Sequence, residues 1–141
     1  MSLKSLHESW SRPDNSRLTA KQLSFRLPIH IAAKLAAFCE LYPQRNRTQI
    51  VADLLDQAMD LLEATLPMEL GEQVFENDTN PPEQRMHHCA GVRAKFRERA
   101  NLIYELFEEE QGIQQPIRLY EPLFVSPKII KDGFGDQGTN R

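Results

Sequence analysis

The chain has only two cysteines, Cys39 and Cys89, and they lie far apart in the sequence. Two such thiols make no disulfide framework, and Cys39, among apolar neighbours, is expected to be a small buried hydrophobe. No apolar run approaches the roughly 20 residues that cross a bilayer. The first residues lack the apolar core of a secretory signal. We therefore expect a cytoplasmic protein with no membrane partner.

Sequence motifs of catalysis are also missing. There is no G-x-S-x-G, no glycine-rich phosphate loop and no cysteine–histidine pair in a catalytic context. His87, His88 and Cys89 are consecutive, so on a helix they point in different directions, and no second ligand cluster stands at a metal-site spacing. We expect no enzyme, no metal and no cofactor.

The charge is slightly acidic overall, with 17 Lys and Arg against 20 Asp and Glu. Taken alone, this argues against a nucleic-acid partner. Residues 1–52, however, contain eight basic and three acidic residues, a net charge of +5. A basic N-terminal region followed by an acidic remainder suits phosphate binding, although a chance local excess of charge gives the same pattern.

The 141 residues leave room for one ordinary domain with extensions. Residues near the N-terminus are poor in apolar side chains, with Trp10 as their one large anchor, and turn residues and prolines interrupt the second half. We predict a flexible N-terminal arm over 1–20, a folded domain over 21–66, a linker over 67–82, a C-terminal helix over 83–112 and an extended, partly disordered tail over 113–141.

Residues 21–28 alternate between apolar and polar side chains. Leu23, Phe25 and Leu27 share one face, which is typical of a half-buried strand. The outward positions are occupied by Gln22, Ser24 and Arg26. Pro28 ends the strand and suits the first turn of a helix.

Two amphipathic helices are predicted next, over 29–42 and 47–64, with Pro43 between them. Asn46 is a good N-cap for the second helix, and Gln49 follows at the spacing of a capping box. A lone strand needs a partner for its backbone groups, and a second copy of the chain is the economical one. The dimer core is then predicted to comprise Leu23, Phe25, Leu27, Ile31, Leu35, Phe38, Ile50 and Leu54.

In such a dimer the outward face of a two-stranded ribbon is exposed, and a ribbon of this kind fits the major groove of DNA. Arg can bind guanine, Gln can bind adenine, and Ser can donate or accept. We therefore expect Gln22, Ser24 and Arg26 to read base edges, and double-stranded DNA to be the partner.

Residues 21–64 resemble the ribbon-helix-helix family, the MetJ/Arc type of repressor, in QLSFRLP, IHIAAKLAAFCELYPQ and RNRTQIVADLL. The resemblance implies a mainly α fold with one short strand per chain, an intermolecular two-stranded antiparallel ribbon and, here, an additional C-terminal helix. It also implies a phosphate contact at the start of the second helix, at Asn46, Arg47 and Thr48. The loop departs from the family because Pro43-Gln44-Arg45 replaces the usual glycine.

The physics of helix termini supports the same contact, since the N-terminus of a helix attracts anions. Arg45 and Arg47 can add charge-assisted hydrogen bonds. A basic arm before a DNA-reading element can also track phosphates. Arg17 and Lys21 are therefore further predicted phosphate contacts.

Three functions stay open from the sequence. The first is a transcriptional regulator, a repressor, binding as a homodimer or as a higher oligomer on DNA. The second is an antitoxin whose residues 83–130 bind a protein partner, since apolar anchors spaced by prolines suit docking in a groove. The third is a plasmid or phage accessory protein. Val92, Phe96, Ala100, Ile103 and Phe107 form a near-heptad seam that favours packing or oligomerisation.

Overall fold

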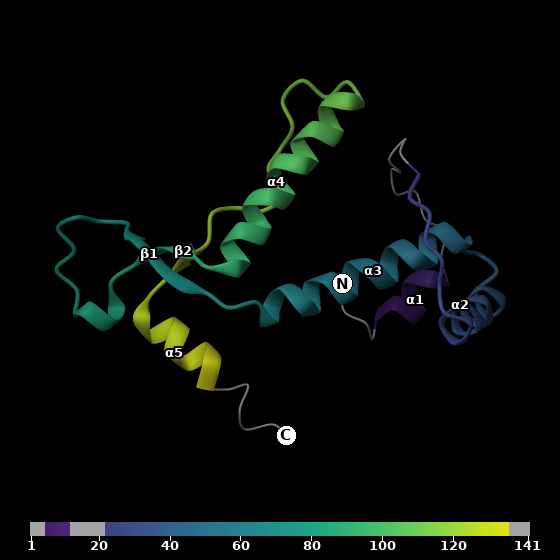
Figure 1. Ribbon diagram of the computed structural model, residues 1–141, viewed down its shortest axis with the longest axis horizontal. Helices are drawn as coiled ribbons and strands as arrows, with labels where there is room; N and C mark the ends of the chain where they lie inside the picture. The colour runs from purple at the N-terminus through teal and green to yellow at the C-terminus, as the bar shows by residue number, and fades with distance from the viewer. Residues whose placement is uncertain (1–4, 12–21, 136–141) are drawn as a thin grey trace. The chain divides into compact units, whose positions relative to one another are not determined.

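The computed structural model describes residues 5–11 and 22–135, and it divides the chain into two units (Figure 1). Unit 1 is Met1–Leu62 and unit 2 is Glu63–Arg141. The boundary falls inside a helix, α3, whose last turn is counted with unit 2. Each unit is described by itself below.

Unit 1 contains α1 (Leu6–Trp10), α2 (Ile29–Leu41) and most of α3 (Arg47–Thr65). Helices α2 and α3 confirm the two helices predicted from the apolar pattern. The α2 segment is rich in alanine and leucine, which favour helix, and Tyr42 caps it just before Pro43. The chain turns through Pro43–Arg45 and enters α3 after Asn46.

The core of unit 1 is small. Ile50 is fully buried, and Leu6 and Trp10 are buried against it. Four half-buried side chains pack around these three residues, namely Leu35, Cys39, Tyr42 and Leu54. Of the predicted dimer core, Ile50, Leu35 and Leu54 therefore lie in or against the core of one chain. Ile31 and Phe38 are exposed.

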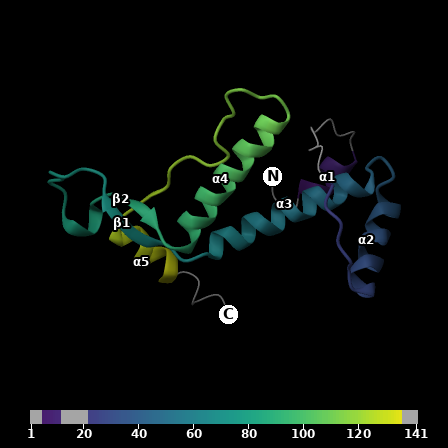
Figure 2. The ribbon, with the colours of Figure 1, turned by 45° about the horizontal axis from the view of Figure 1, so that its top comes forward.

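Unit 2 is built on a three-stranded antiparallel sheet of order β1-β2-β3 (Figure 2). The strands are β1 (Glu69–Gln73), β2 (His87–Ala90) and β3 (Phe124–Val125). Leu70 pairs with Cys89, and His88 pairs with Phe124. The register of β1 shifts between Leu70 and Gln73, and a 3-10 turn, η2 (Pro82–Gln84), lies in the connection to β2.

Two helices complete unit 2, namely α4 (Val92–Glu110) and α5 (Pro127–Gly135). Gly91 is the N-cap of α4, and its φ of 87° and ψ of −167° form a backbone conformation that is essentially confined to glycine. A Cβ there would also lie 3.1 Å from the Pro67 carbonyl oxygen. Ser126 is buried, and its hydroxyl accepts a hydrogen bond from the Ile129 N–H at the start of α5.

The predicted fold class is wrong for the chain as a whole. A ribbon-helix-helix chain has one short strand, whereas this chain forms a three-stranded sheet of its own. The segment predicted to be the strand, 21–28, belongs to no strand over its described residues 22–28. A strand is defined by backbone pairing, and alternation alone supplies no partner.

The predicted extent of the C-terminal helix is also wrong at its start. Residues 83–91 hold η2 and β2, and the helix begins only after Gly91. The segment predicted as a linker contains β1, and the predicted tail contains β3 and α5. Residues 6–10 of the predicted flexible arm form α1. In each case pairing or packing with residues distant in sequence determined the structure.

Candidate functional site

The segment 22–28 precedes α2 without helix or strand, and every one of its side chains is exposed. The apolar side chains at alternate positions are uncovered, with Leu23 78% and Phe25 73% exposed. Gln22, Ser24 and Arg26 occupy the positions between them and are exposed as well. The segment thus presents two chemically different sets of side chains to the solvent.

Pro28 fixes where this segment meets α2. Its backbone, at φ −54° and ψ 148°, is extended, and its carbonyl accepts the first helical hydrogen bond from the Ala32 N–H at 3.0 Å. Proline suits this place because it has no N–H to leave without a partner. Arg26 is the base-reading candidate nearest to α2, and it lies two residues before Pro28, the N-cap of this helix.

The start of α3 has the predicted capping box. The Asn46 side-chain oxygen accepts from the Gln49 N–H at 2.8 Å, and the Gln49 side-chain oxygen accepts from the Asn46 N–H at 2.9 Å. The N–H groups of Arg47 and Thr48 fall in the first turn, where a helix has no acceptor of its own to offer. Both side chains are exposed, so this helix end is accessible.

Arg45 is placed differently from its neighbours. Its side chain is only 7% exposed, and its guanidinium donates to the backbone carbonyl of Ser9 at 2.5 Å. The Ser9 hydroxyl lies 3.4 Å from the same nitrogen. Arg45 thus binds the C-terminal end of α1, where helix carbonyls attract cations. The structure places it inside unit 1, apart from the exposed Arg47.

Helix α1 is held by contacts that the sequence analysis missed. Trp10 is 3% exposed and its indole N–H donates to the Asp53 carboxylate at 2.7 Å. Its ring meets the rings of Phe38 and Tyr42 edge to face. The hydroxyl of Tyr42 also lies 2.6 Å from His7 Nδ1. The size of Trp10 was the one signal that this segment has a packed partner.

Two predicted phosphate contacts, Arg17 and Lys21, lie outside the described residues. The structure therefore brings the remaining candidates into two exposed sets. One is the segment with Gln22, Ser24 and Arg26, and the other is the start of α3 with Asn46, Arg47 and Thr48.

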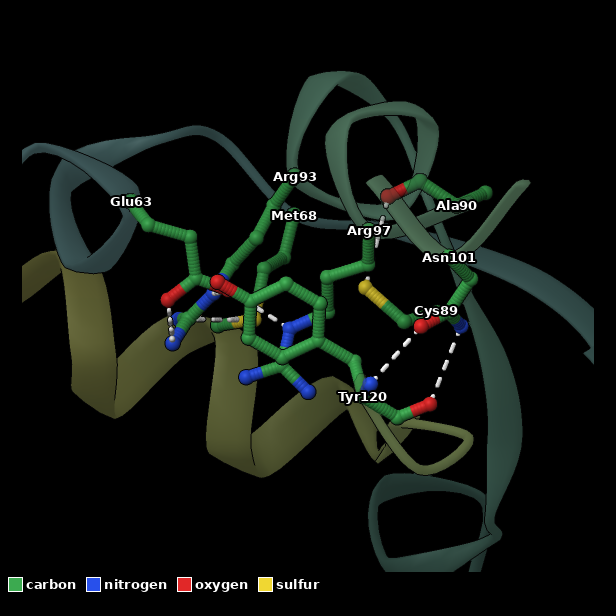
Figure 3. Close-up of polar contacts among 8 residues, drawn as sticks. All are labelled: Glu63, Met68, Cys89, Ala90, Arg93, Arg97, Asn101 and Tyr120. Carbon is green, nitrogen blue, oxygen red and sulfur yellow. Dashed lines mark hydrogen bonds and ion pairs between the residues drawn. The ribbon is translucent and has the colours of Figure 1, made fainter. Parts of the chain in front are cut away.

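A second cluster of polar contacts lies in unit 2, around Glu63 (Figure 3). The Glu63 carboxylate accepts hydrogen bonds from Arg97 at 2.5 Å and from Arg93 at 3.2 and 3.3 Å. Burial raises the pKa of Glu63, but the hydrogen bonds and charges of the two arginines outweigh it and hold the pKa below its ordinary value. The carboxylate is therefore ionised at neutral pH.

Arg97 joins this ion pair to the segment that returns after α4. Its guanidinium carbon lies 4.7 Å from the centroid of the Tyr120 ring, a cation–π geometry. The Asn101 amide then donates to the Tyr120 carbonyl and accepts from the Tyr120 N–H, at 3.0 and 2.7 Å (Figure 3). One turn of α4 thus fixes the backbone that leads into β3.

A pocket of about 420 Å³ opens beside these residues, lined in part by Cys89, Arg97, Asn101, Arg118 and Tyr120. Burial raises the pKa of the Cys89 thiol, and the thiol therefore stays protonated at neutral pH. The wall also includes Glu98 and Glu121, so both signs of charge line it. This mixture selects no class of ligand.

His87, His88 and Cys89 lie on β2 and not on the predicted helix. Successive strand residues point to opposite faces, so His87 and Cys89 share a face that His88 does not. His87 Nδ1 lies 3.0 Å from the Gly71 carbonyl oxygen. Over the described part of the chain, no three His, Cys, Asp or Glu side chains form a group able to hold a metal ion.

Comparison with protein-family models, with curated proteins and with solved structures finds no match to this chain. Among residues 5–11 and 22–135, no helix is both long enough and apolar enough to cross a membrane. Any functional assignment therefore rests on the chemistry and exposure of the residues described above.

Proposed function

We propose that the protein is a sequence-specific DNA-binding regulator of transcription that acts as a dimer. The observation that carries this proposal is the exposed segment 22–28, in which apolar side chains alternate with side chains able to read bases. Gln22, Ser24 and Arg26 include no acid, and each has donors suited to base edges. The proposal concerns unit 1 alone.

The exposed apolar side chains support a dimer. Full burial of an exposed leucine or phenylalanine contributes about 1.5–3 kcal/mol, and Leu23 and Phe25 have most of this to gain because they are 78% and 73% exposed, against 46% for Leu27. A second copy supplies matching side chains, and its own 22–28 segment supplies the backbone groups that this segment needs. In the proposed dimer the two segments pair as a ribbon with the apolar side chains inward.

Pairing of two segments leaves Gln22, Ser24 and Arg26 of both copies on the outer face. A two-stranded ribbon fits the major groove, where Arg recognises guanine and Gln recognises adenine through paired hydrogen bonds. The local charge is favourable: residues 22–47 contain Arg26, Lys34, Arg45 and Arg47 against Glu40 alone. This region can therefore approach phosphate although the whole chain has a net charge of −3.

The start of α3 supports the same proposal. The capping box holds this helix end in a defined geometry, and the first-turn N–H groups of Arg47 and Thr48 suit a phosphate oxygen. Contacts of this kind set the position of a protein on DNA, whereas base contacts set the sequence. We propose that Arg47 and Thr48 bind phosphate and that Arg45 serves the fold of unit 1.

The decisive experiment selects DNA bound by the full chain from a random pool and measures affinity for the selected site by gel shift. Arg26→Ala is expected to weaken specific binding by about 1–3 kcal/mol and to relax the base preference at one position. Arg47→Ala is expected to weaken binding to all sequences and to reduce the slope of log affinity against log salt by about 1.

Lys128→Ala is the matched control, because Lys128 is an exposed cation on α5 in unit 2. It should leave both affinity and base preference unchanged. Phe25→Glu removes the proposed dimer contact and is expected to abolish specific binding, with a lower mass in sedimentation equilibrium. Selection of no common sequence, or equal affinity after combined substitution of Gln22, Ser24 and Arg26 by alanine, contradicts the proposal.

A further inference from the structure

One face of α4 is exposed along its whole length and carries an ordered pattern of charge. Five residues along this face are spaced by four, three, four and three positions, which is the spacing of a heptad seam. They are Lys95, Arg99, Leu102, Leu106 and Glu109, all of them exposed. Glu105 lies on the flank of this face, three residues after Leu102. We call these six residues the α4 face.

Most of the α4 face lies away from the side of the helix that packs within unit 2, whereas Leu102 and Glu105, at its edge, line a small pocket with Pro116, Ile117 and Arg118. Arg93, Arg97 and Asn101 point to Glu63 and to the returning segment, as their hydrogen bonds show. Leu102 and Leu106 are 49% and 50% exposed. These two leucines, with the half-exposed Ile103 beside them, form an apolar centre between a basic end and an acidic end.

Such a face matches itself when a second copy is antiparallel. When Leu102 of one copy faces Leu102 of the other, a residue that precedes Leu102 in one copy faces the residue that follows Leu102 by the same number of positions in the other. Lys95 then lies opposite Glu109, and Arg99 lies opposite Glu105, twice over because the arrangement is twofold, while Leu106 lies opposite the exposed Glu98. A parallel pair brings Lys95 to Lys95 and Glu109 to Glu109, and like charges repel. Antiparallel helix dipoles favour the same orientation.

We propose that the α4 face is an interaction surface for the α4 face of a second copy of this chain, in antiparallel orientation. This contact is separate from the dimer proposed through residues 22–28. It joins two chains, or two such dimers, through unit 2. The interface is small, so the association is expected to be weak in solution and to strengthen when chains are held close together.

The seam predicted from the sequence ran along a different side of this helix. Phe96 and Ala100, which belong to that seam, are half-buried within the chain, whereas its other members, Val92, Ile103 and Phe107, are exposed. The α4 face begins with the charged residues Lys95 and Arg99, so the periodicity of apolar residues did not predict this face.

Complementary charge swaps test the proposal. All variants are made in full chains that carry Phe25→Glu, so that the proposed unit 1 dimer does not contribute. One variant, Lys95→Glu/Arg99→Glu, makes the four charged positions of the face acidic, and another, Glu105→Lys/Glu109→Lys, makes them basic. Sedimentation equilibrium is measured for the parent, for each variant alone and for the equimolar mixture.

The parent is expected to form pairs of chains at high protein concentration, because the contact is weak. Each variant alone should associate roughly tenfold or more weakly, because four ion pairs become four repulsions. The mixture should recover association between unlike chains. Both double substitutions are compatible with the helix dipole, because the acids are introduced in the first half of α4 and the cations in its second half. Circular dichroism checks that the helix content is unchanged.

Orientation is read by a zero-length carbodiimide cross-link between Lys95 and Glu109 in a mixture of isotopically labelled and unlabelled parent chains. A mixed-isotope cross-linked peptide supports the antiparallel register. The proposal is overturned if the variants alone associate like the parent, if their mixture does not associate, or if no such peptide forms. These outcomes do not depend on whether the chain binds DNA.

Discussion

At the scale of single residues, Glu63 shows how one buried carboxylate can organise a helix. It binds Arg93 and Arg97, one turn apart on α4, and Arg97 in turn stacks on Tyr120. Its side chain is 10% exposed, and the side chains of Arg93 and Arg97 are 19% and 22% exposed. Removing the carboxylate leaves two cations in a poorly hydrated site.

Glu63→Gln is therefore expected to lower the free energy of unfolding of unit 2 by about 2–3 kcal/mol at neutral pH. The pH dependence has a definite sign. The folded pKa of Glu63 lies below the ordinary value of 4.5, so the stabilisation is present above that pH and is lost as pH falls through the folded pKa. The difference between wild type and variant should shrink below pH 4.5 in chemical denaturation.

Glu72→Gln is the control for this prediction, because Glu72 is an exposed acid on β1. It should change stability little at any pH. A Glu63→Gln effect that stays constant through the acid range contradicts the assigned ion pair.

At the scale of elements, β1 and β2 come unusually close at Gly71. A Cβ added there would lie 2.6 Å from the backbone carbonyl oxygen of His88, a separation that real side chains do not adopt. The obstacle is backbone in a paired strand, so it cannot rotate away as a side chain does. The shift of register between Leu70 and Gln73 occurs at the same place. Glycine is thus needed here for close approach of two strands.

Gly71→Ala is expected to destabilise the sheet by about 1–3 kcal/mol through overpacking. Thermal unfolding followed by far-ultraviolet circular dichroism measures the loss, and hydrogen exchange at Leu70 and His87 locates it. Glu72→Ala, on the next residue of the same strand, should have a small effect. Equal effects of the two substitutions contradict a steric role for Gly71.

At the scale of the whole molecule, the two units have cores of their own although α3 runs through their boundary. Unit 1 packs around Ile50, and unit 2 buries Val125 in its sheet. Trp10 is the only tryptophan of the chain and belongs to the first of these cores. Its fluorescence therefore reports on unit 1 alone.

We expect Gly71→Ala to leave the denaturant midpoint of the Trp10 fluorescence transition unchanged while it lowers the midpoint seen by circular dichroism. The physical reason is that substitutions without shared contacts act independently. The wild-type chain provides the reference for both probes. A parallel shift of the two transitions indicates one cooperative unit and contradicts this expectation.

The helices α2 and α3 were predictable because their signals are local. Alanine and leucine favour helix, Pro28 and Pro43 frame α2, and the capping box at Asn46 and Gln49 defines the start of α3. The exposure of 22–28 was not predictable in this way, because alternation indicated a half-buried strand, whereas the side chains at both sets of positions are exposed. The sheet was not predictable either, since β1 has Leu70 as its one large apolar residue and β3 is two residues long.

By itself, the sequence determined the two helices of unit 1 and the cap at the start of the second, because each depends on neighbours within a few residues. Only the tertiary structure decided that Arg45 binds α1, that Trp10 joins the core and that His87–Ala90 is the central strand of a sheet. These depend on groups brought together from distant positions. Local patterns carry no signal for such contacts, which form only when the chain packs.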